Sequence, residues 1–277
     1  MLKGKRIGFL GSGNMAEAII NGLIKSGQVK GAEISASDKN IERLNVIVEG
    51  YGIEGHNKNF EVARRSDVII IAVKPQVIEP VLNEISDEIG PDKLLISIVA
   101  GIKIKQIASY LKEGAKIVRV MPNTPALVLS GVSALCPGKG VSDEELELAT
   151  AIFGAVGKAV TVEDEGLMDA VTGLSGSGPA FVYTFIEAMS DAGVKMGLPR
   201  DTANILATET VLGSAKVVSE MKRHTGELRD MVTSPGGTTI AGMGKLEEKG
   251  FRSAVISAVE AAVNKSKELG KQEQSHG

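Results

Sequence analysis

Short, unbroken apolar runs recur through the first half of the chain and narrow the folds it can adopt. Residues 68–73 read VIIIAV, with no polar residue to face water. Such a strand is buried on both faces, which indicates a mainly parallel sheet covered by helices. Strands are predicted at Arg6–Leu10, Glu33–Ser37, Asp67–Val73, Leu94–Val99, Lys116–Val120, Val132–Cys136 and Ala159–Val162. Because helix-like stretches separate them, the pattern predicts a doubly wound α/β fold.

Strand signals end near Glu163, and the rest of the chain predicts helices at Ala180–Met196, Ala203–Val218 and Ala254–Val263. We therefore expect a doubly wound domain over residues 1–163 and an all-α domain over residues 164–277. The first of these helices is apolar almost all round and needs cover on every side. We expect a second subunit to supply it, in an intertwined homodimer with this helix near its centre. The alternative is a helix wrapped by its own subunit.

Charge and cysteine content exclude several classes of protein. The 31 Lys and Arg against 34 Asp and Glu leave a net charge of −3 with no block of like charge, so no nucleic-acid surface is expected. Cys136 is the only cysteine, which leaves no intrachain disulfide and no metal ligand set. The apolar runs are too short to span a bilayer, and the N-terminus lacks the layout of a cleaved signal. We expect a cytoplasmic protein, and we expect the polar tail KQEQSHG from Lys271 to be disordered.

A glycine loop follows the first predicted strand. The stretch IGFLGSGNMAEAI places Gly11, Gly13 and Ala16 in the spacing G-x-G-x-x-A, at the opening of a helix. The first glycine allows the tight turn, the second lets the backbone approach a pyrophosphate, and the small third residue lets helix and strand pack closely. The pattern predicts a dinucleotide site; the alternative is an ordinary glycine-rich turn.

The end of the second strand bears on which dinucleotide is bound. An acidic residue there is typical of an NAD site, whereas this chain has Ser37, Asp38 and Lys39 in succession. Ser37 is a candidate to bind a 2′-phosphate, with Lys39 or Arg43 to balance its charge, so NADP is favoured and NAD stays open. The loops after later strands, Ala72–Pro75, Val99–Gly101 and Met121–Pro125, are expected at the same ligand-binding edge of the sheet.

Two further loops precede predicted helices in the second half. Leu174–Ala180 reads LSGSGPA and Ser234–Thr239 reads SPGGTT. Ser and Pro punctuate the start of a helix well, so a purely structural role is open for both. In SPGGTT, however, Gly236 and Gly237 lower helix propensity with no evident packing gain. Backbone amides bared at a helix start bind a carboxylate or a phosphate, and we interpret this loop as an anion site.

Five segments together resemble one family. They are GFLGSGNMA, AVKPQ, VTGLSGSGPAFVY, GVKMGLPR and SPGGTTIAGMGKLEEKGFRSAVISAVEAA, in this order over nearly the whole chain. They are similar to segments of pyrroline-5-carboxylate reductases, which reduce a cyclic imine to L-proline with NADPH or NADH in the last step of proline synthesis. The resemblance implies a Rossmann-type domain followed by a helical domain that intertwines into dimers, which often assemble further into decamers.

The resemblance also implies roles for individual residues. The pyrophosphate is expected over Leu10, Gly11, Ser12, Gly13, Asn14 and Met15, and the adenosine end at Ser37 and Asn57. The remaining length of the cofactor is expected along Ala72, Val73, Lys74, Pro75, Ala100 and Gly101, with Asn123 near the nicotinamide. The substrate pocket is expected from Glu165, Ser234, Gly236, Gly237, Thr238 and Thr239.

The expected reaction is hydride transfer to the C=N carbon, with the Thr239 hydroxyl bonding the ring nitrogen. Three alternatives stay open. A 3-hydroxyacid dehydrogenase shares the layout, but it places Lys and Asn one turn apart on a buried helix, and Phe181–Asp191 contains no Lys. A dinucleotide sensor without turnover has no use for the second glycine loop. The third is a related enzyme that reduces another cyclic imino acid.

Overall fold

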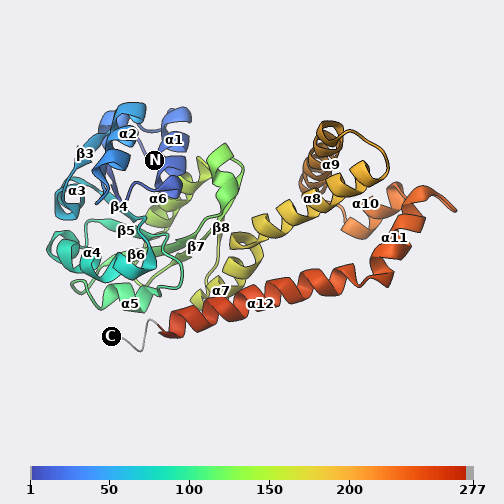
Figure 1. Ribbon diagram of the computed structural model, residues 1–277. Coiled ribbons are helices and arrows are strands. Elements are labelled where there is room, and N and C mark those ends of the chain that lie inside the picture. The colour runs from blue at the N-terminus through green and yellow to red at the C-terminus, as the bar shows by residue number, and fades with distance from the viewer. Residues whose placement is uncertain (1, 273–277) are drawn as a thin grey trace. The chain divides into compact units, whose positions relative to one another are not determined.

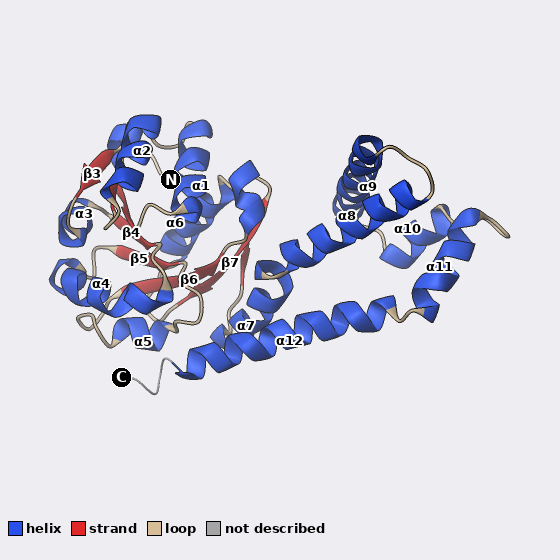
Figure 2. Cartoon of the chain, viewed as in Figure 1, coloured by secondary structure: helices blue, strands red, loops and turns tan. Residues whose placement is uncertain are grey.

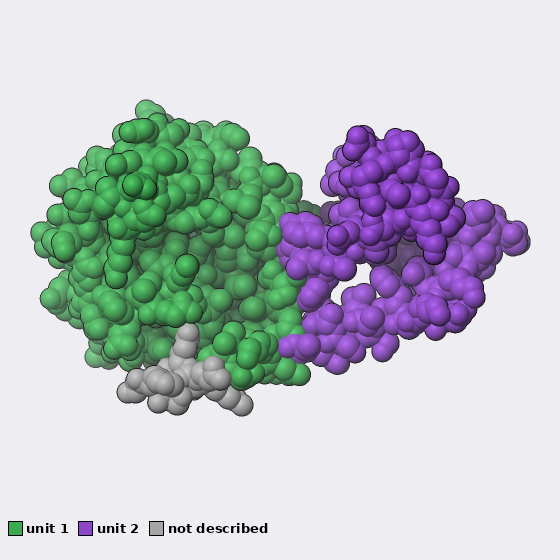
Figure 3. Space-filling view, in the orientation of Figure 1, with its two compact units in different colours: residues 1–177, 262–277 green, residues 178–261 purple. Residues whose placement is uncertain are grey.

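The computed structural model describes residues 2–272 (Figure 1). The polar tail expected to be disordered starts at Lys271, but Lys271 and Gln272 are the last residues of helix α12 (Phe251–Gln272), because the helix continues past the predicted boundary. The rest of the tail, residues 273–277, lies outside the described residues. Contacts group the chain into two compact units, residues 1–177 with 262–277 and residues 178–261 (Figure 3). We refer to them as unit 1 and unit 2. The domain division expected after Glu163 stays a prediction.

Unit 1 is built on one eight-stranded sheet in the order β3-β2-β1-β4-β5-β6-β7-β8 (Figure 2). The strands are β1 (Ile7–Leu10), β2 (Ile34–Ser37), β3 (Glu54–His56), β4 (Val68–Ile71), β5 (Leu94–Ser97), β6 (Lys116–Met121), β7 (Gly131–Pro137) and β8 (Gly157–Thr161). All pairs are parallel except β6 with β7. The expected doubly wound, mainly parallel sheet is confirmed.

Both faces of the sheet are covered by helices, as the unbroken apolar strands require. The helices are α1 (Asn14–Lys25), α2 (Ile41–Tyr51), α3 (Asn59–Arg65), α4 (Ile78–Ile85), α5 (Ile104–Ala108), α6 (Asp143–Gly154) and α7 (Met168–Val171). Alternate residues of β4 enter different cores: Ile70 packs with α1, α2 and α6, and Ile69 and Ile71 pack with α3, α4 and α5. This alternation follows from the period of two along a strand.

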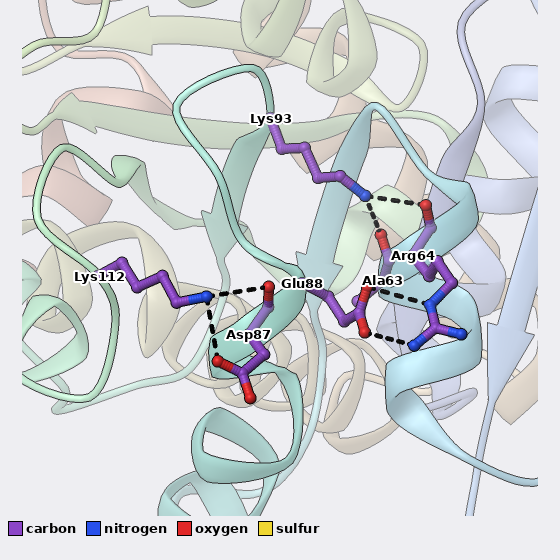
Figure 4. Close-up of polar contacts among 6 residues, drawn as sticks. All are labelled: Ala63, Arg64, Asp87, Glu88, Lys93 and Lys112. Carbon is purple, nitrogen blue, oxygen red and sulfur yellow. Dashed lines mark hydrogen bonds and ion pairs between the residues drawn. The ribbon is translucent and has the colours of Figure 1, made fainter.

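A set of polar contacts fastens the end of α3 to its neighbours (Figure 4). Lys93 Nζ donates to the carbonyl oxygens of Ala63 and Arg64 at 2.5 and 3.0 Å. Arg64 also forms a two-pronged ion pair with Glu88, at 2.7 and 3.2 Å. The last carbonyl groups of a helix lack intrahelical partners and carry a partial negative charge, so an ammonium group stabilises them.

The described residues of unit 2 form helices joined by short loops, with no strand. It contains α8 (Gly178–Lys195), α9 (Arg200–Met221), α10 (Thr225–Met231), α11 (Thr238–Glu248) and the first part of α12 (Phe251–Gln272). Helix α8 packs against α9, where the buried Ser190 hydroxyl donates to Asn204 and accepts from Arg200. Much of the apolar surface of α8 is left uncovered within the chain: Tyr183 is 58% exposed.

Three features of the fold differ from the sequence predictions. Strand β3 was not predicted, because Glu54–His56 is short, polar and contains a glycine. Helix α10, which follows Met221 after a short loop, was not predicted either. Strand β7 runs antiparallel to β6 because η4 (Thr124–Val128) is too short a connection to return the chain to the start of the sheet.

Candidate active site

The glycine loop after β1 has the geometry expected of a pyrophosphate site. Gly11 has φ +99°, and a Cβ atom there would lie 2.7 Å from the Ala72 carbonyl oxygen, so only glycine fits. A Cβ atom on Gly13 would meet no protein atom within 4 Å, which leaves open space over the loop. Ala16 is fully buried against the sheet. Gly11 therefore forms the tight turn and Ala16 packs closely as the spacing predicted, while the approach of a pyrophosphate at Gly13 stays a prediction.

Helix α1 begins without a side-chain cap. Gly13 is its N-cap residue and can offer no side-chain acceptor, so the first amide groups of the helix have no partner from this source. Glu17 in the first turn would repel an anion, but its carboxylate is paired with Arg43 and accepts from the Tyr51 hydroxyl at 3.0 Å. Burial, together with that hydrogen bond to Glu17, raises the pKa of Tyr51. The helix start is thus free to bind an anion.

A cavity of about 330 Å³ opens beside this loop at the carboxyl ends of the strands. Its lining includes six of the predicted residues and positions beside them, namely Gly11, Gly13, Ser37, Asp38, Lys39, Asn59, Ala72, Val73, Lys74, Gln76, Val77 and Val81. Leu10 is fully buried beneath it, whereas Asn57 is exposed and is not among the lining residues. The glycine loop and the loops after β2 and β4 therefore meet at one cavity.

Asn59 is one of four lining residues that the sequence analysis missed, together with Gln76, Val77 and Val81. Its Oδ1 accepts from the buried Ser37 hydroxyl at 2.8 Å, and its side-chain amide donates to Glu84 at 2.6 Å. Asn59 begins α3, which directly follows the unpredicted strand β3. Had β3 been predicted, a polar residue after the carboxyl end of a parallel strand would have been the signal.

Asn123 lies after β6 and is almost fully buried. Its Oδ1 accepts from the Val132 amide at 2.9 Å, and its Nδ2 donates to the Ser175 carbonyl at 3.1 Å. The side chain therefore joins the loop after β6 to β7 and to the π-helical segment η6 (Thr172–Gly176). One N–H of its amide is left for a ligand.

Glu165 is held by groups of its own unit. Its Oε1 accepts from the Ile104 amide at 2.8 Å and from Arg119 at 3.0 Å. Arg119 is 5% exposed, so this ion pair is largely withdrawn from water. Cys136 pairs with Arg119 across β6 and β7; burial raises the pKa of its thiol, and Glu165 adds to the rise while Arg119 opposes it.

In unit 2, the loop Ser234–Thr239 leads into the start of α11. Gly236 has φ +69°, and a Cβ atom on Gly237 would lie 2.4 Å from the Ser234 hydroxyl oxygen. Gly237 is the N-cap residue of α11 and supplies no side-chain cap. The amide groups of Thr238 and Thr239 thus face outward at a helix N-terminus, with the Thr239 side chain half-buried beside them. Such amide groups are the donors that the predicted anion site requires, and the anion site itself stays a prediction.

The described residues show neither a metal centre nor a membrane span. From residue 2 to residue 272, no group of three or more His, Cys, Asp or Glu side chains is arranged to hold a metal ion. Over the same range, no helix combines the length and the apolar character needed to cross a bilayer.

Comparison with known proteins identifies the family. Residues 165–269 match the family described as pyrroline-5-carboxylate reductase dimerisation, and residues 6–101 match the one described as NADP oxidoreductase coenzyme F420-dependent. A pyrroline-5-carboxylate reductase of Methanosarcina acetivorans is 48% identical over 98% of this chain and 100% of its own. The chain belongs to the pyrroline-5-carboxylate reductase family.

Solved structures of this family share the fold. The reductase of Coxiella burnetii has a TM-score of 0.91 at 36% identity, covering 96% of this chain and 98% of that one. The pyrroline carboxylate reductase of Plasmodium falciparum, solved with NADP bound, has a TM-score of 0.86 at 36% identity, covering 98% and 100%. The chain is thus an oxidoreductase of this family with a helical self-association domain, as the resemblance implied.

Proposed function

We propose that this chain reduces 1-pyrroline-5-carboxylate to L-proline with NADPH, as the last step of proline biosynthesis. Its membership in the reductase family, over nearly full length, is the starting point. The observation that carries the proposal is the paired architecture of the two glycine loops. Each ends at an uncapped helix N-terminus, one in unit 1 beside a cavity of about 330 Å³ and one in unit 2 whose loop contains no lysine or arginine.

The residues of unit 1 fit a dinucleotide. Open space above Gly13 and the free amide groups at the start of α1 suit a pyrophosphate. NADPH, when bound, supplies the hydride. We assign Leu10–Met15 to the pyrophosphate, Ser37 and Asn57 to the adenosine end, Ala72–Pro75, Ala100 and Gly101 to the length of the cofactor, and Asn123 to the nicotinamide end.

The residues of unit 2 fit a small carboxylate. Backbone amide groups at a helix start bind an anion by hydrogen bonds and by the positive end of the helix dipole. We assign the substrate carboxylate to Ser234, Gly236, Gly237 and Thr238. Amide and hydroxyl groups are sufficient to bind a small carboxylate, so the loop needs no lysine. Glu165 completes the family-implied set; with Oε1 engaged by the protein, only its Oε2 is available to a substrate.

The chain's contribution to the reaction is mainly orientation. Holding two reacting groups near contact distance supplies several kcal/mol, up to roughly 7–11. The iminium form of the ring is the better hydride acceptor, and we assign to the Thr239 hydroxyl the hydrogen bond to the ring nitrogen and the relay of its proton. An unperturbed hydroxyl is a weak acid, so Thr239 acts as a polariser and relay and not as a strong acid.

The assembly proposed is an intertwined homodimer built on α8, with a decamer of five such dimers as the larger form. The uncovered apolar surface of α8 and the family's dimerisation description support it. A cytoplasmic location is proposed because the single cysteine, Cys136, leaves no intrachain disulfide and so fits a reducing compartment.

The proposal is tested by comparing two acceptors that differ only in the carboxylate. NADPH oxidation is followed by absorbance with pyrroline-5-carboxylate and with 1-pyrroline. Charged hydrogen bonds contribute about 1.5–3 kcal/mol each, so kcat/KM is expected to fall about a hundredfold or more without the carboxylate. Equal rates would contradict the carboxylate site, and NADPH binding without oxidation would indicate a sensor.

A further inference from the structure

Asp38, the acidic residue after β2, uses most of its hydrogen-bonding capacity within the protein. Asp38 Oδ2 accepts from both the amide and the hydroxyl of Ser12, at 2.7 and 2.9 Å, and its Oδ1 accepts from the Asn40 amide at 2.9 Å. A carboxylate offers about four acceptor positions, two on each oxygen. Ser12 occupies both on Oδ2, and one is left on Oδ1. Asp38 therefore holds the glycine loop, and it lacks the two free positions that a pair of ribose hydroxyls requires.

Arg43 is likewise engaged by groups of the protein. Its Nε donates to the Ser12 carbonyl at 2.9 Å, and its guanidinium is paired with Glu17. Both contacts lie behind the glycine loop, on the side of α1 and α2. Arg43 thus supports the same loop that Asp38 holds, and it is not among the residues lining the cavity.

Two lysines line the cavity, and their places differ. Lys39 follows β2 directly, is exposed, and has no ion-pair partner within the part of the chain that the structure describes. Lys74 follows β4, which is separated from β2 by β1 in the sheet. Neighbouring strands lie about 4.8 Å apart, so the end of β4 is about 10 Å from the end of β2.

The polar side chains near Lys39 are also held by hydrogen bonds within the protein. The buried Ser37 hydroxyl donates its hydrogen to Asn59, and both oxygens of Glu84 accept from Asn59. Glu84 is not a lining residue, so no uncommitted carboxylate faces this corner among the residues lining the cavity. In a doubly wound fold, the adenosine ribose lies at the end of the second strand.

We propose that Lys39 selects a 2′-phosphorylated dinucleotide, while Asp38 is a positioning residue that fastens Ser12 and does not read the ribose. The inference rests on the proposed dinucleotide site and names the residues that decide its specificity. A lysine and a phosphate form a charge-assisted hydrogen bond, which is stronger than a neutral one.

The test measures binding of two probes by calorimetry, without any imine substrate. The probes are 2′,5′-ADP and 5′-AMP, which differ only in the 2′-phosphate. The intact chain is expected to bind 2′,5′-ADP more tightly, and Lys39→Met is expected to weaken that binding by about tenfold or more while 5′-AMP changes less than about twofold. Lys25→Met, at the exposed end of α1, is the matched control and should change neither.

Asp38→Asn separates the two roles of the acid. If Asp38 fastens the loop, this variant weakens both probes by a similar factor and lowers the melting temperature. If Asp38 reads the ribose, the variant weakens 5′-AMP selectively, which would overturn the positioning role. An unchanged preference in Lys39→Met would overturn the selection. Failure of the intact chain to bind either probe would overturn the dinucleotide site itself, and the selection with it.

Discussion

The Thr239 hydroxyl is the side-chain group on which the proposed proton relay depends. It lies half-buried at the uncapped start of α11, and its oxygen makes no hydrogen bond to another described residue. Loss of one preorganised donor costs about 2.7–4 kcal/mol elsewhere, so Thr239→Ala is expected to lower kcat about 10²–10³-fold. The KM for NADPH should change little, and Thr239→Ser should keep most of the rate. Steady-state kinetics check this; an unchanged kcat in Thr239→Ala would remove the residue from the mechanism.

Glu165 stabilises the fold through its ion pair with Arg119, in addition to its proposed role in binding the substrate. Removing one partner of a buried ion pair leaves an unpaired buried charge, which costs about 3–5 kcal/mol. Arg119 is 5% exposed, so Glu165→Gln is expected to lower the free energy of unfolding by an amount near the lower end of that range. The exposed Glu163→Gln is the control. Urea denaturation curves that coincide for the two variants would contradict this account.

The end of helix α3 depends on Lys93 (Figure 4). Lys93→Met removes both hydrogen bonds to the last carbonyl groups of the helix and is expected to cost about 1 kcal/mol. Lys112→Met is a control in the same region, because Lys112 and Asp87 form an exposed pair at 3.0 Å worth about 0–1 kcal/mol. Thermal melts should show a larger loss of stability in Lys93→Met than in Lys112→Met. A larger loss in Lys112→Met would contradict the role of Lys93.

The buried strands of the sheet could be predicted, because burial on both faces requires an apolar sequence. The exposed edge strand could not be predicted in this way. Strand β4 reads as an unbroken apolar run because both faces are covered, and the glycine loop has its own spacing. The edge strand β3 has a polar sequence, and the direction of β7 is set by the length of a loop. The bond from Ser12 to Asp38 joins residues 26 apart in sequence, and no local pattern encodes such a pairing.

Many large apolar side chains of unit 2 are exposed in the single chain. Ile205 is 64% exposed and Tyr183 58%, on helices that the family description assigns to dimerisation. Light scattering is expected to give twice the chain's 28.9 kDa, or a multiple of that dimer. Ile205→Glu should shift the mass toward the single chain, whereas Ile41→Glu on unit 1, with 45% exposure, should not. A monomer for the unaltered chain would reject the intertwined dimer.

The proposed reaction forms L-proline, so identifying the product tests it directly. The purified chain is incubated with NADPH and pyrroline-5-carboxylate, and proline is resolved by chiral chromatography while NADPH loss is followed by absorbance. One L-proline is expected for each NADPH consumed, with the rate strongly reduced in Thr239→Ala. NADPH consumption without proline, or no consumption with either NADPH or NADH, would contradict it.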